Sequence, residues 1–593
     1  MLAACAHGPA TKPAAPVVAS ATPPAPPAPP PLTLMPVELA RAAQVATFVA
    51  PTLDRALETG IALARAATPL PLEPAAVREL ALGQLGIPGE VSQQLDLTGP
   101  VSGAVVGFGG DQAIKAAFSF TVKDGVEFAK LAATLGKLVG RHGAAFEIDT
   151  PANGHAWFLP MGRTILFAES SEALMQAGNL ALEARRATKD DVSIVVFPDA
   201  LARALGTDVK SAIERFLGEL DARAASNGKP LSGEGRAQLA DMVGMAADIE
   251  TAELALKLDV TKGVAILARL RARTGTKLAE LSSNVLTVPV DPLLFGKSDA
   301  GLVVTSAYPG RTLNQFRRLR ATLTAKENEK PGAKDASKIN KKDLAAAGRF
   351  VDALTDTLTG NASMVGRLHP TLSLEAAYPL KDAAAAKKLQ AALLAVDRNA
   401  VLATLAAQGT QGQVDVKVPL VRKETVGKLS AVHWNLVFTL PGDKQGMMKK
   451  LLGAPGVDTY GAVIGERLVI TMGVGAKARL AAMAAAGVDK AQVTAPKGAL
   501  AEATNLAGAR SLYYYADLRE ALGLASTMGG PHPDPRLRML SAALTAPIPV
   551  LGGVTGDAQG RVLTLDLTIP PSCLAGIGGV MGAVLGTGMV PAK

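Results

Sequence analysis

Six histidines are the side chains best suited to metal binding or proton transfer, because imidazole ligates metals and titrates near neutral pH. They are His7, His142, His155, His369, His433 and His532. None belongs to a His-Glu-x-x-His pattern or to a pair with metal-ligand spacing. The chain also lacks the Gly-x-Ser-x-Gly motif that presents a serine nucleophile on a sharp turn. The sequence therefore predicts no metal site and no catalytic residues.

Gly473-Val474-Gly475 follows an expected strand and opens an expected helix, which is the setting of a dinucleotide-binding loop. The following residues do not complete the motif with a third glycine, and Glu169-Ser170-Ser171, at the corresponding point of an earlier repeat, is typical of a helix cap. We expect a tight turn here and no cofactor.

One segment supplies most of the net charge of +9. Between Arg311 and Lys342 lie ten basic and three acidic residues, an excess of +7. A solvated loop is the favoured interpretation, since charge runs are usually solvated. The alternative is a surface that binds anionic envelope polymers, without specific nucleic-acid recognition because no aromatic lies between Phe316 and Phe350. Its candidate residues are Arg317, Arg318, Arg320, Lys326, Lys330, Lys334, Lys338, Lys341 and Lys342.

The two cysteines, Cys5 and Cys573, lie at opposite ends of the chain and form neither a disulfide framework nor a zinc-ligand pattern. Cys573 stands among apolar residues with no histidine nearby, so a buried, inert thiol is expected. Cys5 follows small residues near the N-terminus, where a different chemistry applies.

Leu2-Ala3-Ala4-Cys5 resembles the lipobox of bacterial lipoproteins. The resemblance implies that Cys5 is diacylated and becomes the mature N-terminus, and that Ala6 after it favours transport to the outer membrane. The basic region and most of the apolar region of a signal peptide are missing before Cys5. A start codon assigned too far downstream would explain this.

Eleven prolines follow between Pro9 and Pro36. Such a segment cannot bury a core and stays extended as polyproline II. At about 3.1 Å per residue, its roughly 25 residues hold a folded body some 70–80 Å from an anchor. We expect residues 1–36 to be a lipobox remnant and a disordered tether.

The folded part must be built from several core-forming units, since 593 residues are too many for one core. Hydrophobic residues make up 48% and aromatics only 4%, which favours helices packed through small side chains. Residues 37–67 have apolar positions at helical spacing, including Val45 and Phe48. From about residue 100, short strands alternate with helices, and 251–259 with 262–271 and 549–555 with 561–569 are typical of hairpins.

Three segments recur in order. Phe118–Asp124 resembles Val437–Asp443, with Leu374–Asp382 as a looser third copy. Gly162–Ala168 resembles Gly465–Thr471, and Ser193–Gly206 resembles Ser511–Gly523. In the first and third segments the strand ends in an aspartate that can cap the next helix. Repeated β-α units therefore predict an internal repeat.

The fold expected is α+β: two similar lobes of mixed, largely antiparallel sheet with helices on one face. This arrangement resembles an uncharacterised family of secreted bacterial proteins known only as a domain of unknown function, and that resemblance implies no functional residues. The ranges expected are a helical region at 37–99, a first lobe at 100–290, a linking segment with the basic loop at 291–344, a second lobe at 345–570 and a tail at 571–593.

That tail has no charge from Ile569 to Ala592, and Gly578, Gly582 and Gly586 lie four apart. Such spacing is typical of membrane helix contacts, yet many glycines and flanking prolines weaken a helix. Docking on the protein's own sheet or on a partner is favoured over spanning a membrane.

Together these features predict a lipid-anchored protein of the bacterial cell envelope with a non-enzymatic binding or scaffolding role. Its expected partners are the membrane, through the lipid, and then anionic envelope polymers or another envelope protein. A carrier of lipid or other apolar cargo is one alternative. An envelope enzyme whose site is not visible in the sequence is another.

Overall fold

The computed structural model describes most of the folded part of the chain. The residues described are 31–67, 73, 75–76, 78–79, 93–107, 114–150, 154–186, 190–226, 240, 243–283, 301–306, 309–328, 341–367, 371–396, 415–439, 456–486, 512–528, 548–557 and 559–576. Cys5, most of the proline-rich segment and residues 577–593 lie outside them.

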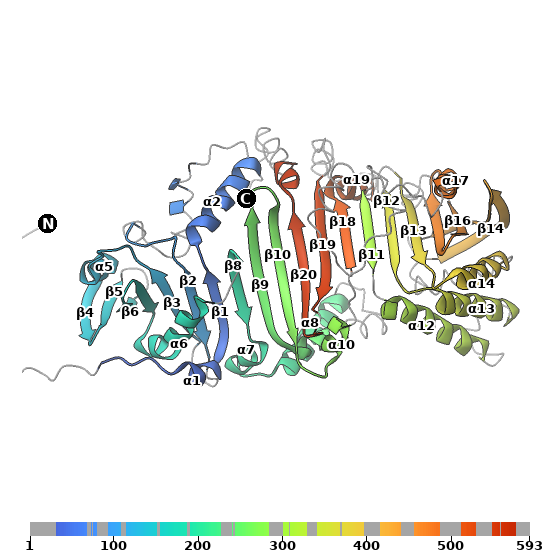
Figure 1. The fold of residues 1–593 in the computed structure, drawn as a ribbon. Helices are drawn as coiled ribbons and strands as arrows, with labels where there is room; N and C mark the ends of the chain where they lie inside the picture. The colour runs from blue at the N-terminus through green and yellow to red at the C-terminus, as the bar shows by residue number, and fades with distance from the viewer. Residues whose placement is uncertain are drawn as a thin grey trace, which may run out of the picture.

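One sheet runs through the described part of the molecule, and its twenty strands all pair antiparallel (Figure 1). The hydrogen-bonded neighbours follow the order β4-β5-β6-β7-β3-β2-β1-β8-β9-β10 and then β20-β19-β18-β11-β12-β13-β17-β16-β15-β14. Green β9 and β10 therefore stand beside red β20 and β19 in the middle of Figure 1. The α+β class is confirmed, and the sheet is wholly antiparallel.

The first half of the sheet has ten strands. They are β1 (Gln44–Ala50), β2 (Val101–Val106), β3 (Lys115–Thr121), β4 (Lys137–His142), β5 (Ala145–Thr150), β6 (Gly154–Met161), β7 (Thr164–Ala168), β8 (Val192–Val196), β9 (Ile249–Asp259) and β10 (Gly263–Ala272). Its helices are α1 (Val37–Arg41), α2 (Leu53–Ala67), α5 (Phe128–Leu135), α6 (Ser171–Ala184), α7 (Pro198–Ala204), α8 (Val209–Ser226), η1 (Met245–Asp248, a 3₁₀ helix) and α10 (Lys277–Ser283).

The second half of the sheet also has ten strands. They are β11 (Leu302–Ser306), β12 (Ala362–Arg367), β13 (Ser373–Pro379), β14 (Asp415–Val426), β15 (Leu429–Thr439), β16 (Val457–Ile464), β17 (Arg467–Gly473), β18 (Leu512–Asp517), β19 (Pro549–Gly556) and β20 (Val562–Ile569). Its helices are α12 (Pro309–Glu327), α13 (Lys341–Thr357), α14 (Ala383–Leu394), α17 (Ala476–Ala486) and α19 (Leu518–Met528).

The two halves have the same topology, because adding ten to each strand number of the first half gives the strand order of the second. They meet where β10 pairs with its own counterpart β20, from Val264 opposite Ile569 to Arg271 opposite Val562. Antiparallel pairing of equivalent strands places a local two-fold axis through this junction. The expected internal repeat is thus present as two ten-stranded half-sheets, and both expected hairpins, β9–β10 and β19–β20, are confirmed.

Strand pairing corrects one of the sequence matches. Phe118–Asp124, which contains the end of β3, corresponds to Leu374–Asp382, which contains most of β13, whereas Val437–Asp443 begins near the end of β15. The same backbone bonds support this: Val122 donates to the carbonyl of Arg163, and Leu380 to that of Glu466, each at 2.9 Å. The looser copy is therefore the true counterpart, since hydrogen-bond register and not local resemblance defines equivalence.

The expected aspartate cap occurs at one of these two positions. The Asp382 side chain accepts a hydrogen bond from the Ala385 amide at 2.7 Å at the start of α14. In the first half, α5 begins after Glu127, whose side chain makes no capping bond. Asp124 lies three residues too early to act there.

Residues 37–67, expected to be a helical region, contain a strand. Gln44–Ala50 forms β1, which pairs with β2 on one side and with β8 on the other. Hydrogen bonding along both edges of a central strand outweighs a helical apolar pattern, and only α1 and α2 remain helical. By pairing, β1 belongs to the first half-sheet and β11 to the second, although they lie in the ranges 37–99 and 291–344.

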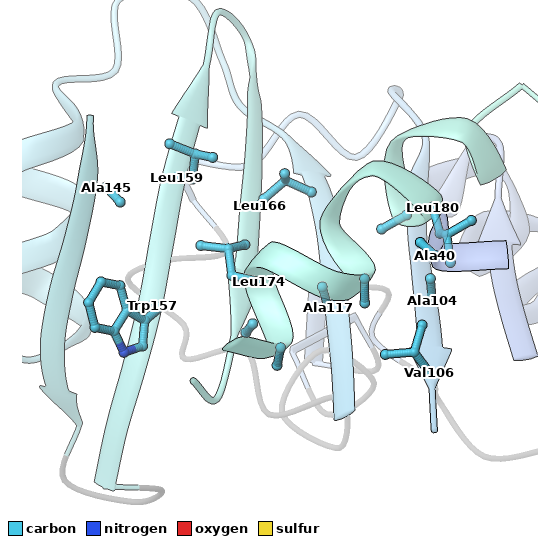
Figure 2. Close-up of a cluster of buried hydrophobic side chains, with 14 of the residues drawn as sticks. Ala40, Ala104, Val106, Ala117, Ala145, Trp157, Leu159, Leu166, Leu174 and Leu180 are labelled. Atoms are coloured by element: carbon cyan, nitrogen blue, oxygen red, sulfur yellow. The ribbon is translucent and has the colours of Figure 1, made fainter. Parts of the chain in front are cut away.

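Helices cover both faces of each half-sheet, whereas one face was expected. Leu166 of β7 packs with α6 in one hydrophobic cluster, while the adjacent Ile165 packs with α5 and α2 in another. Successive residues of a strand point to opposite faces, so these helices lie on opposite sides. Figure 2 shows the α6 side, where Leu174 lies near Leu166, and Leu180 lies near Ala40 and Ala104. Strand sequences that are apolar on both faces require this double cover.

Candidate functional site

A row of apolar residues crosses the middle of the sheet on one face. Its members are neighbours in strand register, so their side chains share that face. From β3 to β20 they are Phe118, Gly103, Phe48, Ile194, Leu254, Ala268 and Leu565. We call these seven residues the open row.

Four large side chains of the open row are exposed to an extent unusual for a sheet interior. Leu254 keeps 52% of its surface accessible, and Phe118, Ile194 and Leu565 each keep 39%. A Cβ built on Gly103 would lie 2.7 Å from the Phe118 ring, so this ring covers the glycine and continues the apolar surface. Gly103 is buried and Phe48 partly buried, so the exposed side chains of the row are Phe118 on β3 and the run from Ile194 to Leu565. Exposed apolar side chains gathered on one sheet face are candidates for a binding site.

Two helices flank the open row on the same face. On one side α2 packs near the end of β9, where Gly60 approaches the side chain of Leu258. On the other side α10 places Leu278 against Leu563 and Leu270. Figure 1 shows α2 and α10 at opposite ends of the central strands. The open row therefore lies between two covered strips of the same sheet face.

The opposite face of these strands is charged. Asp190 is buried, and Arg269 donates to its two carboxylate oxygens at 2.6 and 3.3 Å. Lys257 lies 3.2 Å from the same carboxylate, and Arg269 also pairs with Glu253 at 3.0 Å. Burial raises the pKa of Asp190, but Arg269 and Lys257 more than offset this and the net pKa is below the ordinary value. The central sheet thus has one charged face and one apolar face.

A second cluster of chemical interest surrounds the buried His433 on β15. Its Nδ1 lies 3.1 Å from an oxygen of Glu424, and its Nε2 lies 2.9 Å from an oxygen of Asp458. The imidazole stacks on Tyr460, with ring centroids 4.3 Å apart. Lys477 of α17 donates to the other oxygen of Glu424 at 2.8 Å. Both ring nitrogens of the histidine are therefore engaged by carboxylates.

Charge partners fix the carboxylates of this cluster in their ionised form. Burial raises the pKa of Glu424, and Lys477 with Arg422 lowers it further than burial raises it. Burial also raises the pKa of Asp458, but the hydrogen bonds to His433 and Asn435, together with the nearby charge of Arg422, lower it by more. These contacts join three strands to α17.

The first half carries a related cluster at the corresponding register positions, with the residue types exchanged. There Glu147 of β5 lies between His142 and His155, at 3.5 and 3.8 Å. Trp157 stands where the second half has Tyr460, and its ring centroid is 4.8 Å from that of His142. A histidine between two carboxylates in one half thus matches a carboxylate between two histidines in the other.

These clusters have the geometry of structural ion pairs. Both nitrogens of His433 face carboxylates, so neither points into open space as a base facing a substrate would. Among the residues that the structure describes, no group of three or more His, Cys, Asp or Glu side chains is arranged to hold a metal ion. We therefore place the candidate binding site at the open row.

Residues 311–327 of the basic segment lie on the helix α12, where the sequence favoured a solvated loop, and residues 329–340 lie outside the described residues. Arg317 and Arg318 lie exposed on α12, and Arg320 donates to Asp352 of α13 at 3.0 Å. The apolar positions Phe316, Leu319 and Leu323 alternate with these arginines at helical spacing and pack against α13. Lys326 lies on α12, and Lys341 and Lys342 lie on the first turn of α13. Lys330, Lys334 and Lys338 lie outside the described residues.

The remaining sequence candidates are placed as follows. Gly473 and Gly475 form the expected tight turn, both with positive φ, and a Cβ on Gly473 would lie 2.3 Å from the carbonyl of Leu372. Cys573 is buried against Ile548, as expected. The lipid site at Cys5 stays a prediction. No helix among the described residues is long and apolar enough to span a membrane.

The sequence analysis did not predict the open row, although the spacing of apolar residues in one of its strands indicates an apolar sheet face. Residues 252–258 place Ala252, Leu254, Leu256 and Leu258 at every second position, with Glu253 and Lys257 among the positions between them, which predicts one apolar face. That pattern cannot say whether a helix covers the face.

No known protein family, no curated protein and no solved structure matches this chain. Its function has to be argued from the site itself.

Proposed function

We propose that this chain is a non-enzymatic binding protein of the bacterial cell envelope whose ligand surface is the open row. A lipid on Cys5 and the proline-rich tether hold the two half-sheets at the outer membrane. The proposal is supported by one observation above the others: four large apolar side chains, from Phe118 to Leu565, stay exposed in a single register across seven strands.

Burial of this surface by a ligand is favourable because each Å² of apolar area removed from water contributes about 25 cal/mol. The row presents no hydrogen-bonding side chain, so the ligand it suits is apolar where it makes contact. The charged network behind it, with Arg269 and Asp190, ties β10 to the start of β8 and keeps the floor of the site rigid.

The proposal is tested by titrating the protein with Nile red, a probe that fluoresces in apolar surroundings. Leu254→Asp places a carboxylate at the most exposed position of the open row, and we expect at least about tenfold weaker binding, equivalent to about 1.4 kcal/mol. Leu205→Asp is the matched control, because Leu205 is 64% exposed and lies outside the row. Equal losses in the two variants, or unchanged binding in Leu254→Asp, would contradict the proposal.

A further inference from the structure

We infer that His433 is a proton-operated switch at one end of the sheet: a proton gained by its Nδ1 displaces the Arg422 guanidinium and gives that nitrogen a new partner in Glu424. This inference goes beyond the proposed binding function and does not depend on it. It rests on the hydrogen bonds of one buried imidazole and on the charged groups that face it.

The contacts of His433 are those of a neutral imidazole. The Nε–H of Arg422 donates to Nδ1 at 3.2 Å, so Nδ1 acts as an acceptor there and carries no proton. The single ring proton is then on Nε2, which donates to an oxygen of Asp458 at 2.9 Å. His433 is only 4% exposed, so these side chains and not bulk water satisfy its nitrogens.

An acceptor for a second ring proton already lies beside Nδ1. An oxygen of Glu424 is 3.1 Å from this nitrogen, and the same oxygen pairs with Arg422. When Nδ1 takes a proton from solvent, it becomes a donor, and two N–H groups cannot hydrogen-bond each other. Arg422 therefore has to turn away while Nδ1 donates to Glu424.

Arg422 is free to make this movement. Its side chain is 56% exposed, and β14, on which it lies, is the outermost strand at this end of the described sheet (Figure 1). The guanidinium keeps its charge throughout. The switch thus moves a positive charge at an exposed strand edge.

The other titratable groups facing His433 keep their charge while the imidazole changes its own. The pKa values of Glu424 and Asp458 lie below the ordinary carboxyl value, because hydrogen bonds and positive neighbours outweigh burial. The hydrogen bond to Glu424 raises the pKa of Lys477 on α17, and burial raises that of Tyr460 on β16. Imidazole is the side chain that changes charge between about pH 5 and 8. A change of charge in this cluster near neutral pH is therefore a change at His433.

The test is nuclear magnetic resonance on the full chain, with histidine and arginine labelled with the heavy nitrogen isotope. Between about pH 8 and pH 5 we expect His433 to pass from one protonated ring nitrogen to two. Over the same range, exchange of the Arg422 Nε–H with water should rise about fivefold relative to Arg141, since one ordinary hydrogen bond is lost. Arg141 is the reference because its Nε–H donates to the backbone carbonyl of Gly143.

Two substitutions should shift the switch in opposite directions. Arg422→Leu removes a positive charge beside the ring and should raise the pH of the His433 change by about one unit, whereas Glu424→Gln should lower it by a similar amount. Lys423→Leu is the matched control, because it removes the same charge from the same strand but on the opposite face. It should move that pH far less.

A proton count on His433 that stays constant from pH 8 to pH 5 would overturn the inference, whether one proton or two. So would Arg422 exchange that keeps step with Arg141, or equal shifts in Arg422→Leu and Lys423→Leu. Should a thermal melt show that Arg422→Leu does not fold, Arg422 exchange in the wild type decides the question alone. None of these results bears on the open row, so the switch and the binding role fail or stand separately.

Discussion

Asp190→Ala is expected to lower the free energy of unfolding by about 3 kcal/mol. Its carboxylate is 4% exposed and accepts two hydrogen bonds from Arg269, and Lys257 lies beside it. Removing the Asp190 carboxylate leaves the positive charges of Arg269 and Lys257 poorly compensated at the centre of the sheet. The loss in stability then exceeds the net contribution of the ion pair itself. Urea denaturation followed by circular dichroism measures the change.

The matched control is Asp124→Ala, which removes an exposed ion pair. Asp124 keeps 83% of its side chain accessible and lies 3.1 Å from Arg163, so its loss should cost less than about 1 kcal/mol. If both substitutions cost the same, the charged face would not stabilise the central strands. The folded-state pKa of Asp190 is lowered, so its contribution is present above the unfolded carboxyl pKa of about 4 and is lost as pH falls through the folded value. Wild type and Asp190→Ala should therefore converge in stability at low pH.

The second substitution, Leu174→Ala, is expected to lower the free energy of unfolding by about 3 kcal/mol. The usual loss for a buried leucine changed to alanine is about 2–5 kcal/mol. Leu174 of α6 is fully buried against Leu166 and the strands beneath it (Figure 2). The helix can collapse into the cavity only partly, so both the lost apolar contact and the empty volume destabilise the fold.

Leu39→Ala provides the comparison for this second substitution, because Leu39 on α1 is 64% exposed. A change within about 0.5 kcal/mol is expected there. Urea midpoints of the two variants are compared directly. A loss in Leu174→Ala no greater than in Leu39→Ala would mean that α6 does not close the core.

The hairpins could be predicted from the sequence because their information is local. In 251–259 and 262–271, alternating apolar residues flank a short polar turn, and the structure forms β9 and β10 there. The α+β class and the repeated units follow from the same kind of pattern. Local composition was sufficient wherever neighbours in the chain are also neighbours in the sheet.

Equivalence between the halves could not be predicted in full, because it depends on long-range pairing. Phe118–Asp124 resembles Val437–Asp443 more closely than Leu374–Asp382, yet β3 corresponds to β13 by its bonds to β2 and β7. Residues 37–67 show the same limit, since β1 gains its hydrogen bonds from strands more than fifty residues away. Tertiary pairing overrides local periodicity in both cases.

The candidate site could not be predicted from the sequence for a different reason. The sequence shows that Leu254 and Leu565 belong to apolar strand faces, but their exposure depends on where α2 and α10 end. Residues 311–327, expected as part of a basic loop, instead belong to the amphipathic helix α12, with Leu319 and Leu323 at helical spacing beneath its arginines. The density of charge favoured a loop, whereas the helical spacing of the apolar residues predicts the helix that is present.

The most direct test of the binding role is to ask what the protein already carries. The wild type and Leu254→Asp are isolated from bacterial envelopes with mild detergent, and bound apolar molecules are extracted and identified by mass spectrometry. We expect an apolar small molecule in near-stoichiometric amount with the wild type and a loss of most of it in the variant, counted apart from any group attached covalently to the chain. No bound apolar molecule in the wild type, or equal amounts in both proteins, would contradict the assignment of the open row as a binding surface.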